Sequence, residues 1–164
     1  MKYLKIATTA ALGALVLAGT APAEAKAKRA GATCHKLTPA MMDQQFAAFN
    51  ASWATKNPDK VTALFDDDAV LLATVAAVPR TTPAGVRDYF VKFLMGSPVG
   101  KLETSTFKSG CNWAFRAGTW TVTLTDAASG AKTDVKARYT FLYQFEDGKW
   151  KIEHLHSSVL PANP

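Results

Sequence analysis

The spacing of apolar residues changes once along the chain. Up to about residue 96, apolar positions such as Met42, Phe46 and Phe49 recur every three or four residues, which is the period of an amphipathic helix. After Gly100, apolar and polar residues alternate, which is the period of a strand. This order predicts an α+β fold in which helices come first and an antiparallel meander forms a curved sheet around them.

Capping residues and turn residues set the bounds of the expected elements. Thr38-Pro39 and Thr82-Pro83 each place a capping residue before a proline, which is typical of a helix start. The aspartates at 66–68 do not form a calcium loop, which would need alternating ligands and a distal Glu. They are therefore expected to mark the end of a helix. The expected helices are 39–57, 58–65 and 83–96, and the expected strands are 69–73, 102–107, 113–125, 135–145 and 150–159.

The last two strands carry the most informative residues. Asp147-Gly148 predicts a two-residue hairpin turn. In a regular ladder, Phe141 then opposes His154 and Tyr139 opposes His156, and opposed residues share a face. We therefore expect both imidazoles on the aromatic face under the helices. An apolar wall with a few polar groups is typical of a small-molecule pocket.

A slip of one residue would change this picture. Arg138 would then share a face with the histidines, and an arginine beside two imidazoles is typical of an anion or carboxylate site. In the regular register, Arg138 instead serves a subunit contact or an ion pair with Glu153. The turn alone leaves both registers open.

The two histidines leave several roles open. Imidazoles two residues apart on a strand chelate a metal when a third ligand joins them, but no Asp, Glu or Cys of suitable phase is found, so no metal is expected. His154 or His156 is a candidate general base. The alternative is a structural or pocket-lining role. Ser157 does not pair with His156, since adjacent strand residues point to opposite faces.

The N-terminus carries the pattern of a secretory signal peptide. Lys2 and Lys5 precede an uncharged stretch over 6–20, and Ala23-Glu24-Ala25 supplies small residues before a cut after Ala25. Thr20 stands where a lipoprotein would carry its modified cysteine. We therefore expect a periplasmic or secreted protein without a membrane anchor.

Most of the positive charge lies outside the expected domain. The chain has 164 residues, which allows one domain, and a net charge of +6. Six of the 19 Lys and Arg, but one of the 13 Asp and Glu, precede Leu37. The segment 26–37 is thus a basic flexible tail, and the domain over 38–161 is near neutral. A nucleic-acid partner is not expected.

Two cysteines remain after the predicted cut. Cys34 and Cys111 lie 77 positions apart, and two thiols in a small exported domain most often pair. Such a disulfide would pin the tail to the domain just before the first helix. Two free buried thiols or a redox pair are the alternatives.

Several segments together resemble a known family. They are Phe49-Asn50, Pro58-Asp59-Lys60-Val61, Asp68 to Leu72, Pro79-Arg80, Asp88-Tyr89-Phe90, Gly110-Cys111-Asn112, Ala137 to Phe141, Asp147 to Trp150 and His154 to Ser158. In order and spacing they resemble the bacterial exported members of the nuclear transport factor 2-like (SnoaL-like) superfamily. The branch that they resemble most is the association domain of calcium/calmodulin-dependent protein kinase II.

This resemblance implies a cone of three helices wrapped by a bent sheet, with a cavity at its mouth. It also implies homodimers or larger rings through the outer sheet face. Polyketide cyclases and ketosteroid isomerases of this fold are enzymes, whereas the association domain is an assembly module with a pocket for small acids. Relatives often end in three consecutive histidines, where this chain has Leu155 in the middle.

Candidate ligand-binding residues follow from the hairpin, the helices and the loop at the mouth. Trp53 has a core role as its alternative. Arg80 lies in a loop after Pro79, where it either is solvated or meets an acidic ligand at the mouth of the cone. The full set is Asn50, Trp53, Arg80, Tyr89, Arg138, Tyr139, Phe141, His154 and His156.

Three functions remain open. The first is an exported homo-oligomeric, association-type domain that binds a small ligand, acidic or neutral, without catalysis or cofactor. The second is an isomerase, dehydratase or cyclase that uses a cavity histidine as general base and a tyrosine as hydrogen-bond donor. The third is a structural association module with an empty core.

Overall fold

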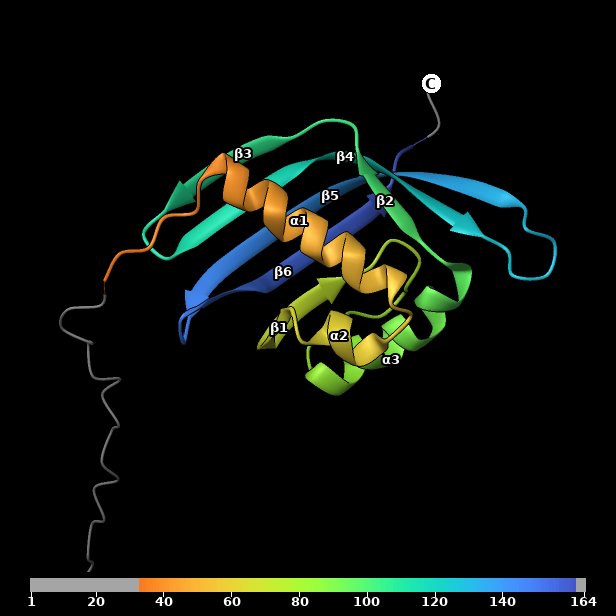
Figure 1. Ribbon diagram of the computed structural model, residues 1–164, viewed down its shortest axis with the longest axis horizontal. Helices are drawn as coiled ribbons and strands as arrows, with labels where there is room; N and C mark the ends of the chain where they lie inside the picture. The colour runs from red at the N-terminus through yellow and green to blue at the C-terminus, as the bar shows by residue number, and fades with distance from the viewer. Residues whose placement is uncertain (1–32, 162–164) are drawn as a thin grey trace, which may run out of the picture. The chain divides into compact units, whose positions relative to one another are not determined.

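The computed structural model describes residues 33–161, in which helices precede a curved sheet (Figure 1). This confirms the predicted α+β class. The predicted signal peptide and most of the basic tail lie outside the described residues. The elements are α1 (Pro39–Ala54), α2 (Pro58–Thr62), β1 (Phe65–Leu72), α3 (Pro83–Phe93), the 3-10 helix η1 (Leu94–Gly96), β2 (Val99–Leu102), β3 (Thr106–Gly110), β4 (Trp113–Thr125), β5 (Lys132–Glu146) and β6 (Lys149–Val159).

The helices begin where the capping residues predict. The Thr38 side chain accepts a hydrogen bond from the Met41 N–H, and the Thr82 side chain accepts one from the Gly85 N–H. Each cap satisfies a backbone donor that the first helical turn leaves free, and the proline that follows needs no such partner. α1 lies across one face of the sheet, which we call the inner face (Figure 1).

The strands that follow the helices, β2 to β6, form the predicted antiparallel meander, but the sheet as a whole is mixed because β1 adds a parallel strand at one edge. The strand order is β1-β6-β5-β4-β2, β3 pairs with β4, and β1 runs parallel to β6. β1 is also longer than predicted, because the aspartates at 66–68 lie within it. They fall where the register between β1 and β6 shifts, between Phe65 and Val70. The second helix is correspondingly shorter than predicted.

The strand expected over 102–107 is two strands. β2 and β3 both pair with β4, and the chain between them crosses close to Gly118. A Cβ at Gly118 would collide with the Thr104 carbonyl, so only glycine permits this crossing. The alternation of apolar residues does not reveal such a crossing.

The β5–β6 hairpin contains the main correction to the predicted register. Asp147 and Gly148 have φ of 48° and 79°, and Tyr143 pairs with Ile152, as the two-residue turn predicts. A β-bulge follows, since Leu142 next to Tyr143 pairs with His154. Two residues of β6 thus oppose one step of β5.

The bulge exchanges the faces of the residues that follow it. Phe141 pairs with Leu155 and Tyr139 pairs with Ser157, so the predicted pairs Phe141–His154 and Tyr139–His156 are wrong. Leu155 and Ser157 lie on the inner face with the buried aromatic residues. The histidines lie on the other face, which we call the outer face.

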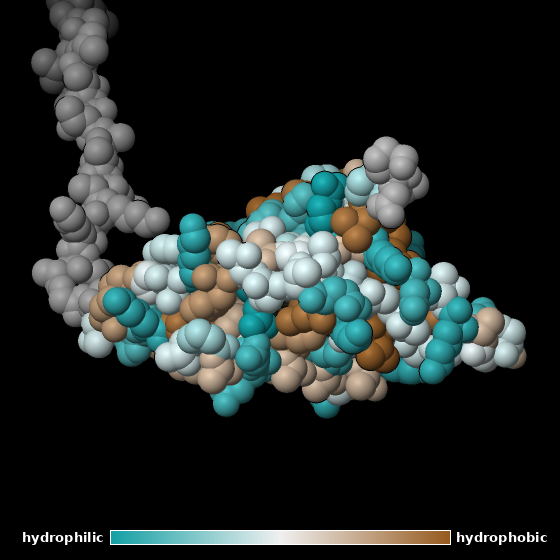
Figure 2. Space-filling view, turned by 90° about the horizontal axis from the view of Figure 1, so that it is seen from above, coloured by the Kyte–Doolittle hydropathy of each residue, from teal (hydrophilic) through white to brown (hydrophobic). Residues whose placement is uncertain are grey.

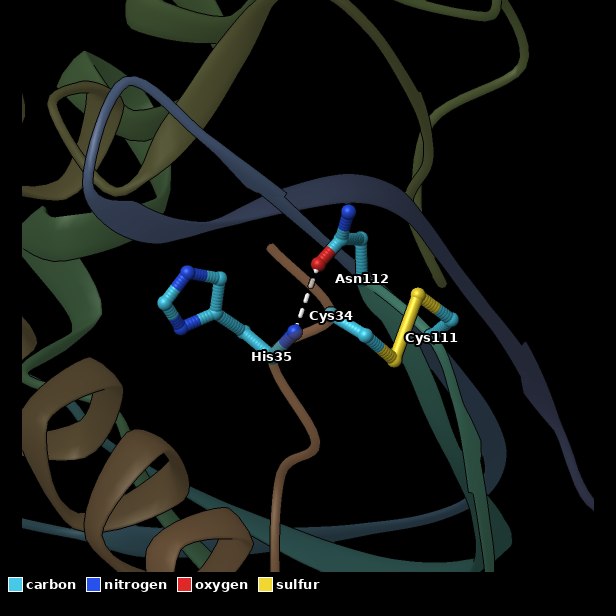
Figure 3. The surroundings of a disulfide bond; sticks show 4 residues. All are labelled: Cys34, His35, Cys111 and Asn112. Carbon is cyan, nitrogen blue, oxygen red and sulfur yellow. Dashed lines mark hydrogen bonds between the residues drawn. A yellow bond between two sulfur atoms is a disulfide. The ribbon is translucent and has the colours of Figure 1, made fainter. Parts of the chain in front are cut away.

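The predicted disulfide is present at one end of the sheet (Figure 3). Cys34 and Cys111 are joined, with their Cα atoms 4.9 Å apart. Beside the disulfide, the His35 N–H donates to Asn112 Oδ1 at 2.8 Å and the Asn112 N–H donates to the His35 carbonyl at 2.8 Å. The segment before α1 is thus fixed to the β3–β4 turn by covalent and hydrogen bonds.

Candidate ligand-binding site

A small cavity lies on the inner face of the sheet, where side chains of α3 and the end of α1 meet the strands. Its volume is about 40 Å³, and its lining is almost wholly apolar. The lining residues are Trp53, Leu71, Ala73, Thr74, Val75, Tyr89, Phe90, Phe93, Trp120, Val122, Leu124, Val135, Leu155 and Ser157. Such a lining favours a ligand with a hydrocarbon surface.

Few polar groups face this cavity, and most of them are hydrogen-bonded. The hydroxyl groups of Thr74 and Ser157 are bonded to each other, and Trp120 Nε1 donates to Ser157 Oγ at 3.1 Å. Trp53 is 3% exposed, and its Nε1 has no hydrogen-bond partner within residues 33–161. A buried donor without a partner is costly, so this N–H is available to a ligand oxygen or a water.

Tyr89 forms part of the cavity wall from α3. Its ring stacks on Phe93 with the centroids 5.3 Å apart. Burial raises the pKa of Tyr89 well above its usual range, because the phenolate loses its hydration. Tyr89 is therefore a neutral phenol at physiological pH, able to donate a hydrogen bond.

A wider groove adjoins the cavity. Its volume is about 410 Å³, and it shares Val75, Tyr89, Phe93 and Leu124 with the cavity lining. These four side chains form the boundary between the two spaces. The remaining groove residues are Ala76, Ala77, Val78, Arg80, Lys92 and Gly96.

The groove differs from the cavity in its charge. Arg80 Nη1 lies 3.5 Å from Asp88 Oδ2, and Arg80 Nε is buried without a partner in the described chain. The Lys92 side chain, which is exposed, lies in the same groove and forms no ion pair within residues 33–161. The groove thus offers two cations, of which one is weakly paired.

Three of the residues predicted to bind a ligand lie together here. Trp53 and Tyr89 line the cavity, Tyr89 also lines the groove, and Arg80 lies in the groove. Two backbone hydrogen bonds fix the position of Arg80 beside Leu71. The Arg80 N–H donates to the Leu71 carbonyl at 2.9 Å, and the Leu71 N–H donates to the Arg80 carbonyl at 2.8 Å. Ligand binding by these residues stays a prediction.

Tyr139 and Phe141 lie in the core and Asn50 is half-buried beside it, and all three lie outside the cavity lining. The Asn50 amide bonds to both the N–H and the carbonyl of Gly100, at 2.9 and 2.8 Å, and so joins α1 to β2. The Tyr139 hydroxyl donates to the Thr104 carbonyl at 3.0 Å, and burial raises its pKa. Phe141 packs edge-on against Phe49. These contacts give all three a structural role.

Arg138, His154 and His156 lie on the outer face. Arg138 pairs with Ser158, which follows His156 by two residues on the same face. The two imidazole centroids are 6.5 Å apart. The observed register therefore places Arg138 on the face of the histidines, as expected for a one-residue slip. It also places Arg138, His154 and His156 outside the lining of the inner cavity. His156 lines a separate pocket of about 360 Å³, which shares Ala73, Thr74 and Ser157 with the cavity.

Sequence reasoning missed Thr74, Leu155 and Ser157 as cavity residues. The period-2 alternation of β6 contains Leu155 and Ser157, but in the phase opposite to that of Trp150 and Ile152. The alternation between inner and outer residues shifts by one position at Glu153. This shift can be recognised only when β6 is paired with a neighbouring strand.

A second buried polar group lies under the first half of α1. The Arg116 side chain on the inner face of β4 is 7% exposed and forms an ion pair with Asp43, whose side chain is 69% exposed. Arg116 Nε and Nη1 have no partners within the described residues. This pair links α1 to the sheet.

Three carboxylates gather where the bulges of β1 and β6 meet. Oxygens of Asp66, Asp68 and Glu153 lie within 4.8 Å of one another. Burial raises the pKa of Glu153, and the neighbouring Asp68 and Asp66 raise it further. Exposed acidic groups often gather without a metal, and no other group in the described chain points to one here.

The comparisons with known proteins agree on the fold. Residues 46–152 match the SnoaL-like domain. A protein from Xanthomonas campestris, proposed to be a calcium/calmodulin-dependent protein kinase II association domain, is 41% identical, with a TM-score of 0.71 over 76% of this chain and 89% of that one. Among curated proteins, none matches this sequence.

More distant structures share the fold alone. A proposed dehydratase of the NTF2-like family from Streptomyces avermitilis is 10% identical, with a TM-score of 0.66 over 74% of this chain and 95% of that one. A proposed aromatic ring hydroxylase from Novosphingobium aromaticivorans is 20% identical, with a TM-score of 0.64 over 74% and 87%. The shared fold therefore accompanies different proposed functions.

Proposed function

The chain belongs to the SnoaL-like family of the NTF2-like superfamily, and from this premise we propose that it is an exported, homo-oligomeric, association-type domain that binds a small molecule in its inner cavity. The observation that carries the proposal is the apolar cavity under α3, with an adjoining cationic groove and a Trp53 N–H that has no hydrogen-bond partner among residues 33–161.

The lining of the cavity supports binding more than acid–base catalysis. Within the described residues that line it, the polar groups are hydroxyls and indole N–H groups, without an imidazole, carboxylate or thiol. A general base has to reach the proton that it abstracts. His154 and His156, the candidate bases, lie on the opposite face of the sheet. The isomerase, dehydratase or cyclase alternative therefore has no support in their placement.

The outer face supports the proposed homo-oligomer. Trp113 is 41% exposed and stacks on Phe115, with the ring centroids 6.3 Å apart. Phe115 pairs with Leu142 on the same face. Aromatic and aliphatic side chains beside Arg138 and the histidines are a composition typical of interface cores. The similarity to a proposed association domain points the same way.

Export is supported by the disulfide together with the N-terminal sequence pattern. Disulfides form and persist in oxidising compartments. None of the helices in the described part of the chain is long and apolar enough to cross a membrane. Expression of the full chain in a Gram-negative host should give a periplasmic protein that begins at Lys26. A protein that keeps its N-terminus and stays in the cytoplasm would contradict export.

Ligand binding is tested with two probes, 1-octanol and octanoate, by calorimetry and by the fluorescence of the tryptophans. Trp53 and Trp120 line the cavity, so a ligand there should change their emission. Val135→Phe fills the cavity from β5 and should abolish binding. Val91→Phe, on the exposed surface of α3, is the matched control and should leave it unchanged. If neither probe binds, or if Val135→Phe binds as wild type does, the cavity proposal is wrong.

Oligomerisation is tested by light scattering. The chain from Lys26 has a mass of roughly 15 kDa, scaled from 17.6 kDa for 164 residues, and the measured mass should be at least twice that. Leu142→Glu, on the outer face, should lower the mass to that of a monomer, whereas Val91→Glu should not. A monomer at every concentration would contradict the assembly.

A further inference from the structure

One short segment borders the cavity and both larger spaces beside it. Residues 73–79 follow β1, and the first three of them line the cavity. The next two, Ala76 and Ala77, line both the groove and the pocket of about 360 Å³ that contains His156. The segment is therefore part of the wall that these three spaces share.

The two ends of this segment are fixed. The backbone N–H and carbonyl of Arg80 are both hydrogen-bonded to Leu71, so the chain on either side of the segment is held together. Pro79, next to Arg80, restricts the backbone further. A surface loop of about 6–16 residues with adjacent ends is an Ω-loop. Any movement is therefore confined to the residues between these ends.

The middle of the loop packs poorly against the rest of the protein. None of residues 73–79 is buried, and Val75 and Val78 are 66% and 62% exposed. On the face seen in Figure 2, apolar side chains occur in separate patches between hydrophilic ones, so exposed valines alone do not indicate a partner. A segment with few buried apolar contacts is one that opens locally.

A single hydrogen bond ties the loop to the sheet. Within residues 33–161, the one hydrogen bond from residues 74–79 to another element joins the hydroxyl groups of Thr74 and Ser157. Ser157 is buried and also accepts from Trp120 Nε1 at 3.1 Å, so its side chain is fixed. When this bond breaks, it is therefore Thr74 that moves.

The cavity needs an opening of this kind to admit an organic molecule. Its volume is about 40 Å³, whereas a cavity that holds benzene has about 150 Å³. Most of its other walls are core side chains such as Trp53, Phe90 and Trp120, which are 3%, 1% and 3% exposed. Close-packed core side chains resist displacement, so the loop is the wall that yields most easily.

We propose that residues 73–79 form a hinged flap through which a ligand enters the cavity, and that the Thr74–Ser157 hydrogen bond is its latch. This rests on the proposed function, and it adds the route of the ligand and the residues that control its entry. Opening the flap joins the cavity to the groove and to the pocket beside His156, since the loop is the wall that they share. The latch sets how fast a ligand enters and leaves, and the fixed core walls set how tightly it binds.

The flap is tested first without a ligand, by the solvent exchange of the indole N–H groups of Trp53 and Trp120 in NMR spectra. Both side chains line the cavity and are buried, so their N–H groups exchange when the flap opens. Thr74→Val removes the latch but keeps the shape of the side chain, and it should raise both exchange rates about three- to tenfold. Thr133→Val, at an exposed position on β5, is the matched control and should leave both rates unchanged.

The same spectra distinguish local opening from global unfolding. Indole exchange that is faster than the exchange of the backbone amides of β5 shows local opening. Indole exchange that Thr74→Val leaves as in wild type overturns the flap.

Ligand entry is tested with 1-octanol in stopped-flow measurements of tryptophan fluorescence. Thr74→Val should raise the association and dissociation rates of octanol together, about three- to tenfold, and change its Kd by less than about twofold. Thr74→Cys together with Ser157→Cys, once oxidised, locks the flap and should slow association by about tenfold or more until it is reduced. Wild-type protein under the same reductant is the control for the native Cys34–Cys111 disulfide.

The outcomes separate the flap from the proposed function. If octanol binds and neither Thr74→Val nor the locked flap changes its rates, the ligand enters by another route and the flap is wrong. A Thr74→Val effect on the dissociation rate alone would show that Thr74 contacts the ligand and does not act as a latch. If octanol does not bind at all, the proposed function is wrong, and indole exchange still decides whether the loop opens.

Discussion

The inner and outer faces of β5 and β6 differ in chemistry although their residues alternate along the same strands. Phe141, Leu155 and Ser157 face the core and the cavity, whereas Leu142 and His156 face outward. Burial follows this division, since Leu155 is 3% exposed and His156 is exposed. One extra residue in β6 is enough to decide which side chains line the core and the cavity and which lie on the outer face.

The largest loss of stability expected from this comparison is at Leu155. Leu155→Ala leaves a cavity in the inner wall and should lower the free energy of unfolding by about 2–5 kcal/mol. His156→Ala removes an exposed side chain and should change it by less than about 0.5 kcal/mol. Urea unfolding measures both. The reverse order would show a regular ladder with the imidazoles inside.

Arg116 on the inner face and Arg138 on the outer face give the next contrast. Asp43→Ala leaves the buried Arg116 without its counterion and should cost about 1–3 kcal/mol, below the range for fully buried pairs because Asp43 is 69% exposed. Arg138→Gln on the outer face should cost less than about 0.5 kcal/mol.

A double variant tests the cause of that loss. Arg116→Met in the Asp43→Ala background removes the unpaired charge and should recover much of the lost stability. An Asp43→Ala variant as stable as wild type, or one that Arg116→Met weakens further, would show that the pair does not matter in this way.

Local signals predicted most of the fold. The structure contains the helix starts at Thr38-Pro39 and Thr82-Pro83 and the hairpin at Asp147-Gly148, because each depends only on neighbouring residues. It also contains the disulfide, which depends on two cysteines alone. The pairing of β1 with β6 depends on residues more than 80 positions apart, and the alternation within each strand does not encode it.

The candidate site could be predicted only in part, for the same reason. Trp53, Tyr89 and Arg80 were found because helix periodicity and a loop position suffice to place them near the cone mouth. Leu155 and Ser157 were missed because their face depends on the bulge at Glu153. Local turn chemistry fixes the register at the turn, but a bulge farther along resets it.

Two neighbouring serines on β6 provide a smaller contrast. Ser157 Oγ accepts from Trp120 Nε1 and bonds to Thr74, whereas Ser158 pairs with Arg138 on the outer face. Ser157→Ala leaves the indole N–H without its acceptor and should cost about 1–2 kcal/mol. Ser158→Ala should be close to neutral. Equal unfolding midpoints for the two variants in urea would contradict the inner position of Ser157.

The smallest change in stability is expected at Glu153, the extra residue in the β-bulge of β6. Burial and the nearby Asp68 and Asp66 raise the pKa of Glu153 in the folded protein above its unfolded value. The folded state therefore binds the proton more tightly, and stability falls as pH rises from the unfolded pKa, about 4.3, through the folded pKa. Solvent screens this partly exposed carboxylate, so Glu153→Gln should stabilise the protein by only about 0.2–0.5 kcal/mol at neutral pH, and this gain should vanish below about pH 4.

Asp59 supplies a control of opposite sign for Glu153. A hydrogen bond and charge from Arg87 lower the pKa of Asp59, so its contribution to stability is present at neutral pH and is lost as pH falls through the lowered pKa. Asp59→Asn should therefore destabilise the protein at neutral pH, and its effect should fade in acid. Urea unfolding of both variants between pH 3 and 8 measures the two trends. A Glu153→Gln gain that does not change with pH would show that the three carboxylates do not repel one another, and that the bulge places Glu153 away from β1.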